Sequence, residues 1–220
     1  MLQVKICGIT TVEQGSAIAT LGATALGYIC VSSSPRYISA ERIAPIAAAV
    51  RAIAPEVQHF GVFANAPIAD ILSITKTADF SVIQLHGDET PATCQLLRDA
   101  LSYANLAHIK LVKALRIKGS EDLDTAFSYE PHIDMLLLDA YHPDQLGGTG
   151  HTLDWAALKS FSPSRPWLLA GGLAPGNVLT ALAKLSPSGI DLSSGLERSP
   201  GDKDLSKVRQ LFDRLAIMTA

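Results

Sequence analysis

The chain has 220 residues, of which 48% are hydrophobic and 18% are charged, and its formal net charge is −3. This composition is ordinary for a globular protein, and the lack of a Lys/Arg-rich run argues against a nucleic-acid partner. No segment reaches the roughly 18 uninterrupted apolar residues that a membrane span needs. The first ten residues, MLQVKICGIT, also lack the charged and apolar regions of a secretory signal.

The cysteines are few, odd in number and widely spaced: Cys7, Cys30 and Cys94. Such cysteines fit reduced thiols in the cytoplasm better than a disulfide framework. The sequence contains no CxxC or HxxxH pair, so it offers no ligand set for a structural zinc ion. We therefore expect a cytoplasmic protein that binds no metal and meets no membrane.

Short apolar runs alternate with amphipathic stretches along the chain. The apolar runs predict strands at Leu2–Cys7, Ala25–Cys30, Val57–Phe63, Ser81–Leu85, Ile109–Leu115, Met135–Asp139, Trp167–Ala170 and Gly189–Ser193. Between them a periodicity of about 3.6 residues predicts helices. These helices are expected near Val12–Leu21, Ile43–Ile53, Ile68–Thr77, Pro91–Leu101, Asp122–Phe127, Trp155–Phe161, Pro175–Leu185 and Leu205–Leu215.

Eight strand–helix units in a row, without a hairpin signal, predict a parallel sheet. The number of units and the chain length favour an α/β fold in which residues 1–220 form a single-domain (β/α)8 TIM barrel. A doubly wound open sheet is the alternative, although it usually has fewer strands at this length. In a barrel of this kind the reacting groups lie at the C-terminal ends of the strands and in the loops that follow.

The first and sixth strands end in candidate catalytic groups. Alternation places Lys5 and Cys7 on one face of the first strand, and we expect that face to point inward because the outer face meets apolar helices. The same argument turns Leu137 and Asp139 inward on the sixth strand. A thiol and a carboxyl facing one barrel mouth could act as base and acid. The alternatives are a buried small side chain for Cys7 and a loop cap for Asp139.

The loops after the seventh and eighth strands suggest an anion site. They contain Gly171 and Gly172, and Ser193, Ser194 and Gly195. Glycines expose backbone N–H groups, helix N-termini add favourable dipoles, and phosphate sites recur in these two barrel loops. We therefore expect phosphate binding here, with tight turns that bind nothing as the alternative.

Further polar side chains are expected near the same mouth. Arg36, in the loop SPRYIS after the second strand, could grip a carboxylate, or could be a solvated loop arginine. Gln84 and His86 end the fourth strand and should point inward, His86 to bind substrate or to form a hydrogen bond at the rim. Lys113 should also point inward and could contact an anionic substrate. The GGTG segment at 147–150 has the composition of a mobile lid.

An ion pair is expected between the first and last strands. Lys5 precedes Cys7 by one inward step, and Asp191 occupies the matching position on the eighth strand. These strands are neighbours in a closed barrel, and an unpaired buried charge would be very costly. We therefore predict that Lys5 and Asp191 pair inside the barrel.

Several segments together resemble one enzyme family. KICGIT, SPRYIS, GVF, QLHGDE, LLLDA, GGTG followed by DW, AGGL, and DLSSGLE with PGDKD are similar to the ordered motifs of phosphoribosylanthranilate isomerases, from about Lys5 to Asp204. The resemblance implies a (β/α)8 barrel and an Amadori rearrangement of N-(5-phosphoribosyl)anthranilate in tryptophan biosynthesis. It implies a small phosphosugar substrate and no cofactor, and leaves the oligomeric state open between monomer and homodimer.

The resemblance also implies roles for individual residues. Cys7 corresponds to the family's general base and Asp139 to its general acid. Arg36 corresponds to the arginine that contacts the anthranilate carboxylate, and the phosphate site falls on Gly172 and 193–195. Two segments depart from the pattern, since VSSSP lacks an aromatic residue and Leu153 stands where phenylalanine is common.

Two other functions are compatible with a barrel that has these phosphate loops. The first is a different phosphosugar isomerase, such as the related enzyme of histidine biosynthesis, which typically has two aspartates where this chain has Cys7 and Asp139. The second is a phosphate-binding barrel without catalysis, which would need neither residue. Loss of phosphoribosylanthranilate fluorescence would distinguish catalysis from binding alone.

Overall fold

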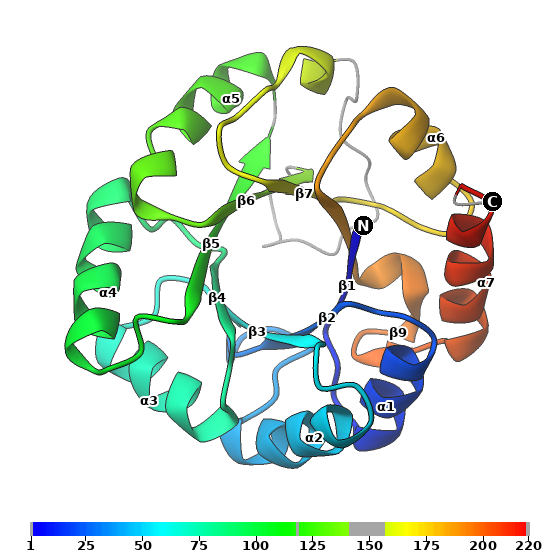
Figure 1. Cartoon of the computed structure of the whole chain (residues 1–220), viewed down its shortest axis with the longest axis horizontal. Helices are drawn as coiled ribbons and strands as arrows, with labels where there is room; N and C mark the ends of the chain where they lie inside the picture. Colours follow the sequence, from blue (N-terminus) through cyan, green and yellow to red (C-terminus); the bar gives the residue numbers. More distant parts are fainter. Residues whose placement is uncertain (1, 118, 141–156, 219–220) are drawn as a thin grey trace.

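A computed structural model describes residues 2–117, 119–140 and 157–218. Within these residues, parallel strands β1 to β8 close into a barrel in chain order, and β8 pairs with β1. Figure 1 looks down this barrel, with the helices arranged around its outside. The predicted closed barrel is therefore confirmed over the open sheet.

The barrel strands are β1 (Gln3–Cys7), β2 (Ala25–Ile29), β3 (Gln58–Phe63), β4 (Val82–Leu85), β5 (Lys110–Ile117), β6 (Met135–Ala140), β7 (Trp167–Leu169) and β8 (Gly189–Leu192). The α-helices are α1 (Val12–Thr20), α2 (Ala40–Ile53), α3 (Ile68–Ala78), α4 (Pro91–Tyr103), α5 (Ser120–Phe127), α6 (Val178–Lys184) and α7 (Leu205–Ala216). Short 3-10 helices are η1 (Glu130–His132), η2 (Ala157–Ser160) and η3 (Ser194–Leu196). All eight strands were expected close to these positions.

The core has two layers, as strand alternation requires. Side chains that point into the barrel form a small apolar cluster, which includes Phe60, Val112 and Leu137. Side chains on the outer face, such as Ile6 and Leu138, join a larger cluster with the helices. Because the interior cluster is small, polar side chains occupy part of the barrel interior.

Two predicted elements differ from the structure. The helix expected from Pro175 begins at Val178 as α6, because the Asn177 side chain accepts from the N–H of Ala174 and donates to the carbonyl of Gly172 in a turn. The helix expected at Trp155–Phe161 is the 3-10 helix η2 where the structure describes it.

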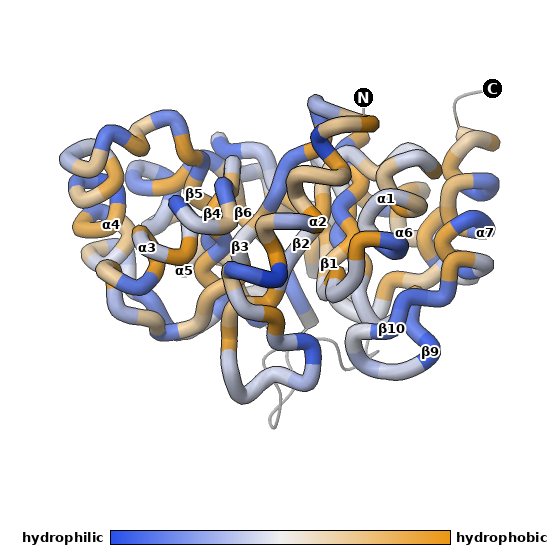
Figure 2. The backbone as a smooth tube through the Cα atoms, turned by 90° about the horizontal axis from the view of Figure 1, so that it is seen from below, coloured by the Kyte–Doolittle hydropathy of each residue, from blue (hydrophilic) through white to orange (hydrophobic). Residues whose placement is uncertain are grey.

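The expectation that the chain lacks a hairpin was wrong. Strands β9 (Glu197–Ser199) and β10 (Asp202–Lys203) form an antiparallel pair after β8. The turn between them contains Pro200 and Gly201, and Gly201 has φ +82, a left-handed conformation that glycine adopts readily. Figure 2 shows this hairpin at one end of the barrel, beside the start of α7. It extends the loop after β8 towards the barrel mouth.

The ion pair between the first and last strands is confirmed. Lys5 and Asp191 are register partners of β1 and β8, and Lys5 Nζ lies 2.9 Å from Asp191 Oδ2. Burial acts to lower the pKa of Lys5, but the charge of Asp191, together with Cys7, outweighs it and raises this pKa above its usual value. Lys5 is therefore a buried ammonium directly beneath the barrel mouth.

A buried histidine on β3 makes the stability of the fold depend on pH. His59 is 1% exposed, its Nδ1 lies 3.0 Å from the Tyr28 hydroxyl, and its Nε2 has no hydrogen-bond partner among the described residues. Burial, and next the charge of Arg51, lower the pKa of His59 to about 4, while Asp79 acts in the opposite direction.

We expect the free energy of unfolding to decrease as pH falls from about 6.5, the usual pKa of histidine, to about 4. Below pH 6.5 the unfolded chain binds a proton at position 59 that the folded protein does not bind. The expected loss from this group is about 3 kcal/mol at most. Urea unfolding of the protein and of His59→Gln at pH 7 and pH 4.5 measures it. An equal pH dependence in both proteins would contradict the assignment to His59.

Candidate active site

A cavity of about 460 Å³ opens at the C-terminal ends of the strands. Nine of the ten predicted site residues line it: Cys7, Arg36, Gln84, His86, Asp139, Gly171, Gly172, Ser193 and Ser194. The exception is Gly195, where an added methyl group would lie 2.1 Å from the carbonyl oxygen of Leu173. Gly195 therefore allows the loops after β7 and β8 to pack closely. This agrees with the alternative in which the glycine serves a tight turn, and a binding role for Gly195 stays a prediction.

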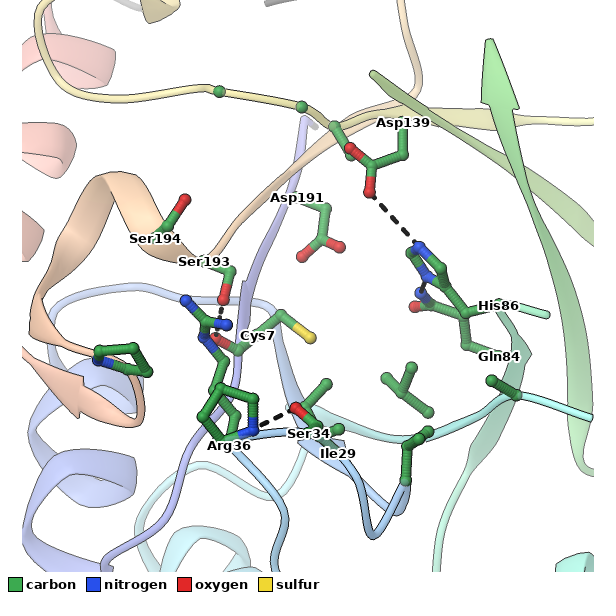
Figure 3. Close-up of a pocket in the computed structure, with 18 of the residues that line it drawn as sticks. Cys7, Ile29, Ser34, Arg36, Gln84, His86, Asp139, Asp191, Ser193 and Ser194 are labelled. Atoms are coloured by element: carbon green, nitrogen blue, oxygen red, sulfur yellow. Dashed lines mark hydrogen bonds and ion pairs between the residues drawn. The ribbon is translucent and has the colours of Figure 1, made fainter. Parts of the chain in front are cut away.

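Cys7 and Asp139 reach this cavity from β1 and β6. Figure 3 shows the sulfur of Cys7 and the carboxyl of Asp139 turned into the same space from different sides. Their residues are only 5% and 6% exposed. Gly27 on β2 makes room for the thiol, because a methyl group there would lie 2.6 Å from Cys7 Sγ. The arrangement can remove a proton at one wall and donate one at the other.

The thiol lies in a buried environment with opposing charges. Burial raises the pKa of Cys7, the ammonium of Lys5 lowers it, Asp191 raises it and Lys203 lowers it, so that the pKa lies above its usual value. In the free protein the thiol is therefore protonated at neutral pH. The ammonium groups of Lys5 and Lys203 act against this shift, because a nearby positive charge favours the thiolate.

Asp139 is part of a short polar chain along the cavity wall. His86 Nε2 lies 3.4 Å from Asp139 Oδ2, and Gln84 Nε2 lies 2.9 Å from His86 Nδ1. Both contacts are drawn in Figure 3. His86 thus makes a rim hydrogen bond with Gln84, as one of the two expectations held, and it also lines the cavity. Its Nε2 has no hydrogen-bond partner among the described residues.

The expected phosphate loops both line the cavity. Gly171 and Gly172 have φ values of 85 and 60, and such left-handed backbone favours glycine at both positions. Ser193 donates from its hydroxyl to the carbonyl of Cys7, at 3.1 Å. We expected the N-termini of α-helices at these loops, but the structure has none directly there. The loop after β8 leads into the 3-10 helix η3, and α6 begins only at Val178.

Two functional residues were missed by the sequence analysis, and both belong to the hairpin. Arg36 donates from Nε and Nη2 to the carboxylate of Glu197, at 3.0 and 2.7 Å. Glu197 also accepts from Lys203 Nζ at 2.7 Å, and Lys203 Nζ lies 3.2 Å from the carbonyl oxygen of Ser193. The Pro-Gly turn in PGDKD was the available signal. The hairpin therefore fixes Arg36 and brings a cation beside the loop after β8.

Burial acts against the charged form of Glu197, but the hydrogen bonds and charges of Arg36 and Lys203 outweigh it. They hold the pKa of Glu197 below its usual range. Glu197 is therefore a carboxylate at neutral pH, and it accepts hydrogen bonds from both Arg36 and Lys203.

Lys113 does not contact the cavity, so the expectation of a substrate contact was wrong. The expected inward orientation was also wrong: Val112 and Ala114 belong to the interior cluster, so Lys113 between them points to the outer face. There it donates to Glu89 Oε2 and to the carbonyl of Gly87, both at 2.7 Å. The segment 147–150 and Leu153 lie outside the described residues. In the described ranges, no three His, Cys, Asp or Glu side chains are grouped to hold a metal ion. None of the described helices has the length and apolar character for a membrane span.

Comparisons with known proteins agree on one family. The N-(5'phosphoribosyl)anthranilate (PRA) isomerase family matches residues 4–214. The N-(5'-phosphoribosyl)anthranilate isomerase of Crocosphaera subtropica is 56% identical over 214 residues, which cover 97% of this chain and 98% of that protein. Among solved structures, phosphoribosyl anthranilate isomerase from Thermus thermophilus is 34% identical with a TM-score of 0.81, covering 99% of this chain and 100% of that one. A phosphoribosyl anthranilate isomerase in complex with reduced 1-(o-carboxyphenylamino)-1-deoxyribulose 5-phosphate is 29% identical with a TM-score of 0.82, covering 98% of this chain and 99% of that one.

Proposed function

The chain belongs to the N-(5'-phosphoribosyl)anthranilate isomerase family, and from this premise we propose that Cys7 is the general base and Asp139 the general acid of its reaction. The protein is an aldose–ketose isomerase, an intramolecular oxidoreductase of tryptophan biosynthesis. It converts N-(5-phosphoribosyl)anthranilate to 1-(2-carboxyphenylamino)-1-deoxyribulose 5-phosphate by an Amadori rearrangement. The observation that carries the residue assignment is a thiol and a carboxyl that face one cavity from β1 and β6.

The proposed reaction begins at the sugar ring. Asp139 gives its proton to the ring oxygen, the bond from that oxygen to C1′ breaks, and the anthranilate nitrogen becomes part of an iminium group. The Cys7 thiolate then removes the proton from C2′, and the electrons of that C–H bond move towards the iminium nitrogen. The resulting enolamine tautomerises to the amino-ketose. Atoms and electrons balance within the substrate, so the two side chains need only to exchange protons.

The substrate's two anionic groups have candidate partners among the residues that line the cavity. We assign the phosphate to the loops of Gly171, Gly172, Ser193 and Ser194, and the anthranilate carboxylate to Arg36. Gln84 and His86 are assigned to the sugar-facing wall beside Asp139. Binding at groups remote from C2′ would hold the open-chain sugar in place and supply several kcal/mol of barrier reduction.

Replacing Arg36 is expected to weaken substrate binding. Arg36→Met should raise KM by roughly ten- to a hundredfold, the value of a charge-assisted hydrogen bond, and should reduce kcat much less. The decrease in phosphoribosylanthranilate fluorescence at varied substrate concentration measures both constants. Arg198→Met is the matched control, because Arg198 pairs with Asp202 on the same hairpin but does not line the cavity. A kcat loss at unchanged KM in Arg36→Met would contradict the binding role.

We further infer that residues 1–220 act as one barrel domain in the cytoplasm. The closed barrel supports the first inference, and three cysteines without disulfide partners support the second.

The same fluorescence assay on the purified protein tests the function directly. The substrate is fluorescent, and its conversion to the rearranged product is followed by the loss of that signal.

A further inference from the structure

A buried ion pair lies beside the cavity without lining it. Lys113 on β5 and Glu89 in the loop after β4 approach to 2.7 Å, with side chains that are 2% and 4% exposed. Removing two charges from water is expensive, and an apolar pair of similar size is often equally stable or more so. Stability of the barrel alone therefore does not account for this pair, and its hydrogen bonds indicate a second role.

The pair holds both polar groups of Gly87. The N–H of Gly87 donates to Glu89 Oε2 at 2.9 Å, and its carbonyl accepts from Lys113 Nζ at 2.7 Å. Glu89 Oε1 also accepts from the backbone N–H of Asn65 at 2.7 Å. A methyl group on Gly87 would lie 2.5 Å from Asn65 Oδ1, so the two loops are in close contact here. Glu89 and Lys113 thus fix the loop after β4 to β5 and to the loop after β3.

His86 immediately precedes this fixed point. Its own N–H donates to the carbonyl of Phe63 at 2.7 Å, and the next peptide group is the one whose N–H Glu89 accepts. Both peptide groups that flank His86 are therefore held, which restricts its backbone rotation. From that position its imidazole lies 3.4 Å from Asp139.

We propose that Glu89 and Lys113 are positioning residues that hold the His86 imidazole against Asp139 during the reaction. The proposal rests on the proposed function, in which Asp139 is the general acid. Neither residue touches the substrate. They act through the Gly87 peptide and His86, so their contribution belongs to the proton-transfer step rather than to binding.

The test is a double-mutant cycle on kcat. Glu89→Gln/Lys113→Met removes both charges together and leaves no buried charge unpaired. We expect it to lower kcat by about tenfold, because small displacements of reacting groups have large effects on rate, and to leave KM within about twofold. In a His86→Asn background the same two substitutions should change kcat by less than about twofold, since the residue that they position is gone.

A control ion pair separates positioning from general loss of structure. Arg98 and Asp134 are 2.8 Å apart on α4 and just before β6, and neither lines the cavity. Arg98→Met/Asp134→Asn should leave kcat unchanged. If Glu89→Gln/Lys113→Met does not fold, Gly87→Ala serves instead, because it keeps both charges and forces the loop away from Asn65. It should show the same kcat loss and the same masking by His86→Asn.

The outcomes are distinct. An unchanged kcat in the double variant, or an equal loss in both the His86 and Asn backgrounds, would overturn the positioning role. The positioning role would also be overturned if Glu89→Gln/Lys113→Met lowered kcat while His86→Asn alone kept a normal kcat. The failure of the proposed function has its own signature, namely normal turnover in Asp139→Asn, which this cycle does not involve.

Discussion

Replacing Cys7 with alanine is expected to lower kcat by roughly a hundred- to ten-thousandfold and to change KM little, the signature of a lost general base. The thiol faces the cavity at the end of β1. Steady-state fluorescence measurements on Cys7→Ala give both constants. Cys94→Ala is the matched control, because Cys94 is also buried but lies on α4 and does not line the cavity. Near-normal turnover in Cys7→Ala would exclude the thiol as the base.

The same assignment predicts a pH dependence. Burial holds the pKa of Cys7 above its usual value in the free protein, in spite of the nearby ammonium of Lys5. The reactive thiolate is then the minor form at neutral pH, and its fraction increases as pH rises. We therefore expect the rate at which a small electrophile alkylates Cys7, which needs only the thiolate, to increase with pH through the neutral range without reaching a plateau below the usual pKa of a thiol, about 8.5.

Replacing Asp139 with asparagine is expected to lower kcat by a similar factor, roughly a hundred- to ten-thousandfold. An amide has nearly the shape of the carboxyl group but cannot give the acid proton to the ring oxygen. KM should remain within a few-fold, because the phosphate loops and Arg36 are unchanged. The measurement is the same assay, with crystallography or circular dichroism to show that the barrel is intact.

Asp134→Asn controls for the loss of a carboxylate near β6, since Asp134 precedes the same strand but does not line the cavity. Its kcat should stay near that of the unsubstituted protein. If Asp139→Asn retained most of its turnover, Asp139 would not be the general acid, and another group in the cavity would have to donate the proton.

Strand alternation explains why much of the site could be predicted from the sequence. Side chains in a strand alternate between two faces, so KIC fixed Lys5 and Cys7 on the inward face once the outer face was assigned to helices. Closure of the barrel made the first and eighth strands neighbours, and this was enough to predict the pair of Lys5 with Asp191. Both arguments need only the period of the strand and the order of the strands.

The contacts of Arg36 and Lys113 could not be predicted in this way. Arg36 meets Glu197 across 161 positions of the chain. Arg36 lies in a loop, where no strand period fixes the direction of a side chain, and Glu197 begins β9, a strand that the sequence pattern did not predict. Lys113 was assigned to the wrong face of its strand, because the run KLVKALRI has apolar residues on both faces and its pattern does not show which face points inward. Its partner Glu89 is supplied by a loop, whose path the sequence pattern leaves open.

The pair of Lys5 with Asp191 also bears on how the protein forms. The two residues are separated by 186 positions, so the first strand cannot neutralise its buried ammonium until nearly the whole polypeptide has been synthesised. Contacts this distant in sequence form late and slow the folding of a domain. A nascent polypeptide that ends before β8 would have to expose Lys5 to water or bury it alone, and the second choice is strongly unfavourable. When β8 pairs with β1, it closes the barrel and also brings Asp191 to the buried ammonium of Lys5. Closure of the barrel and formation of the site around Cys7 therefore depend on the same step.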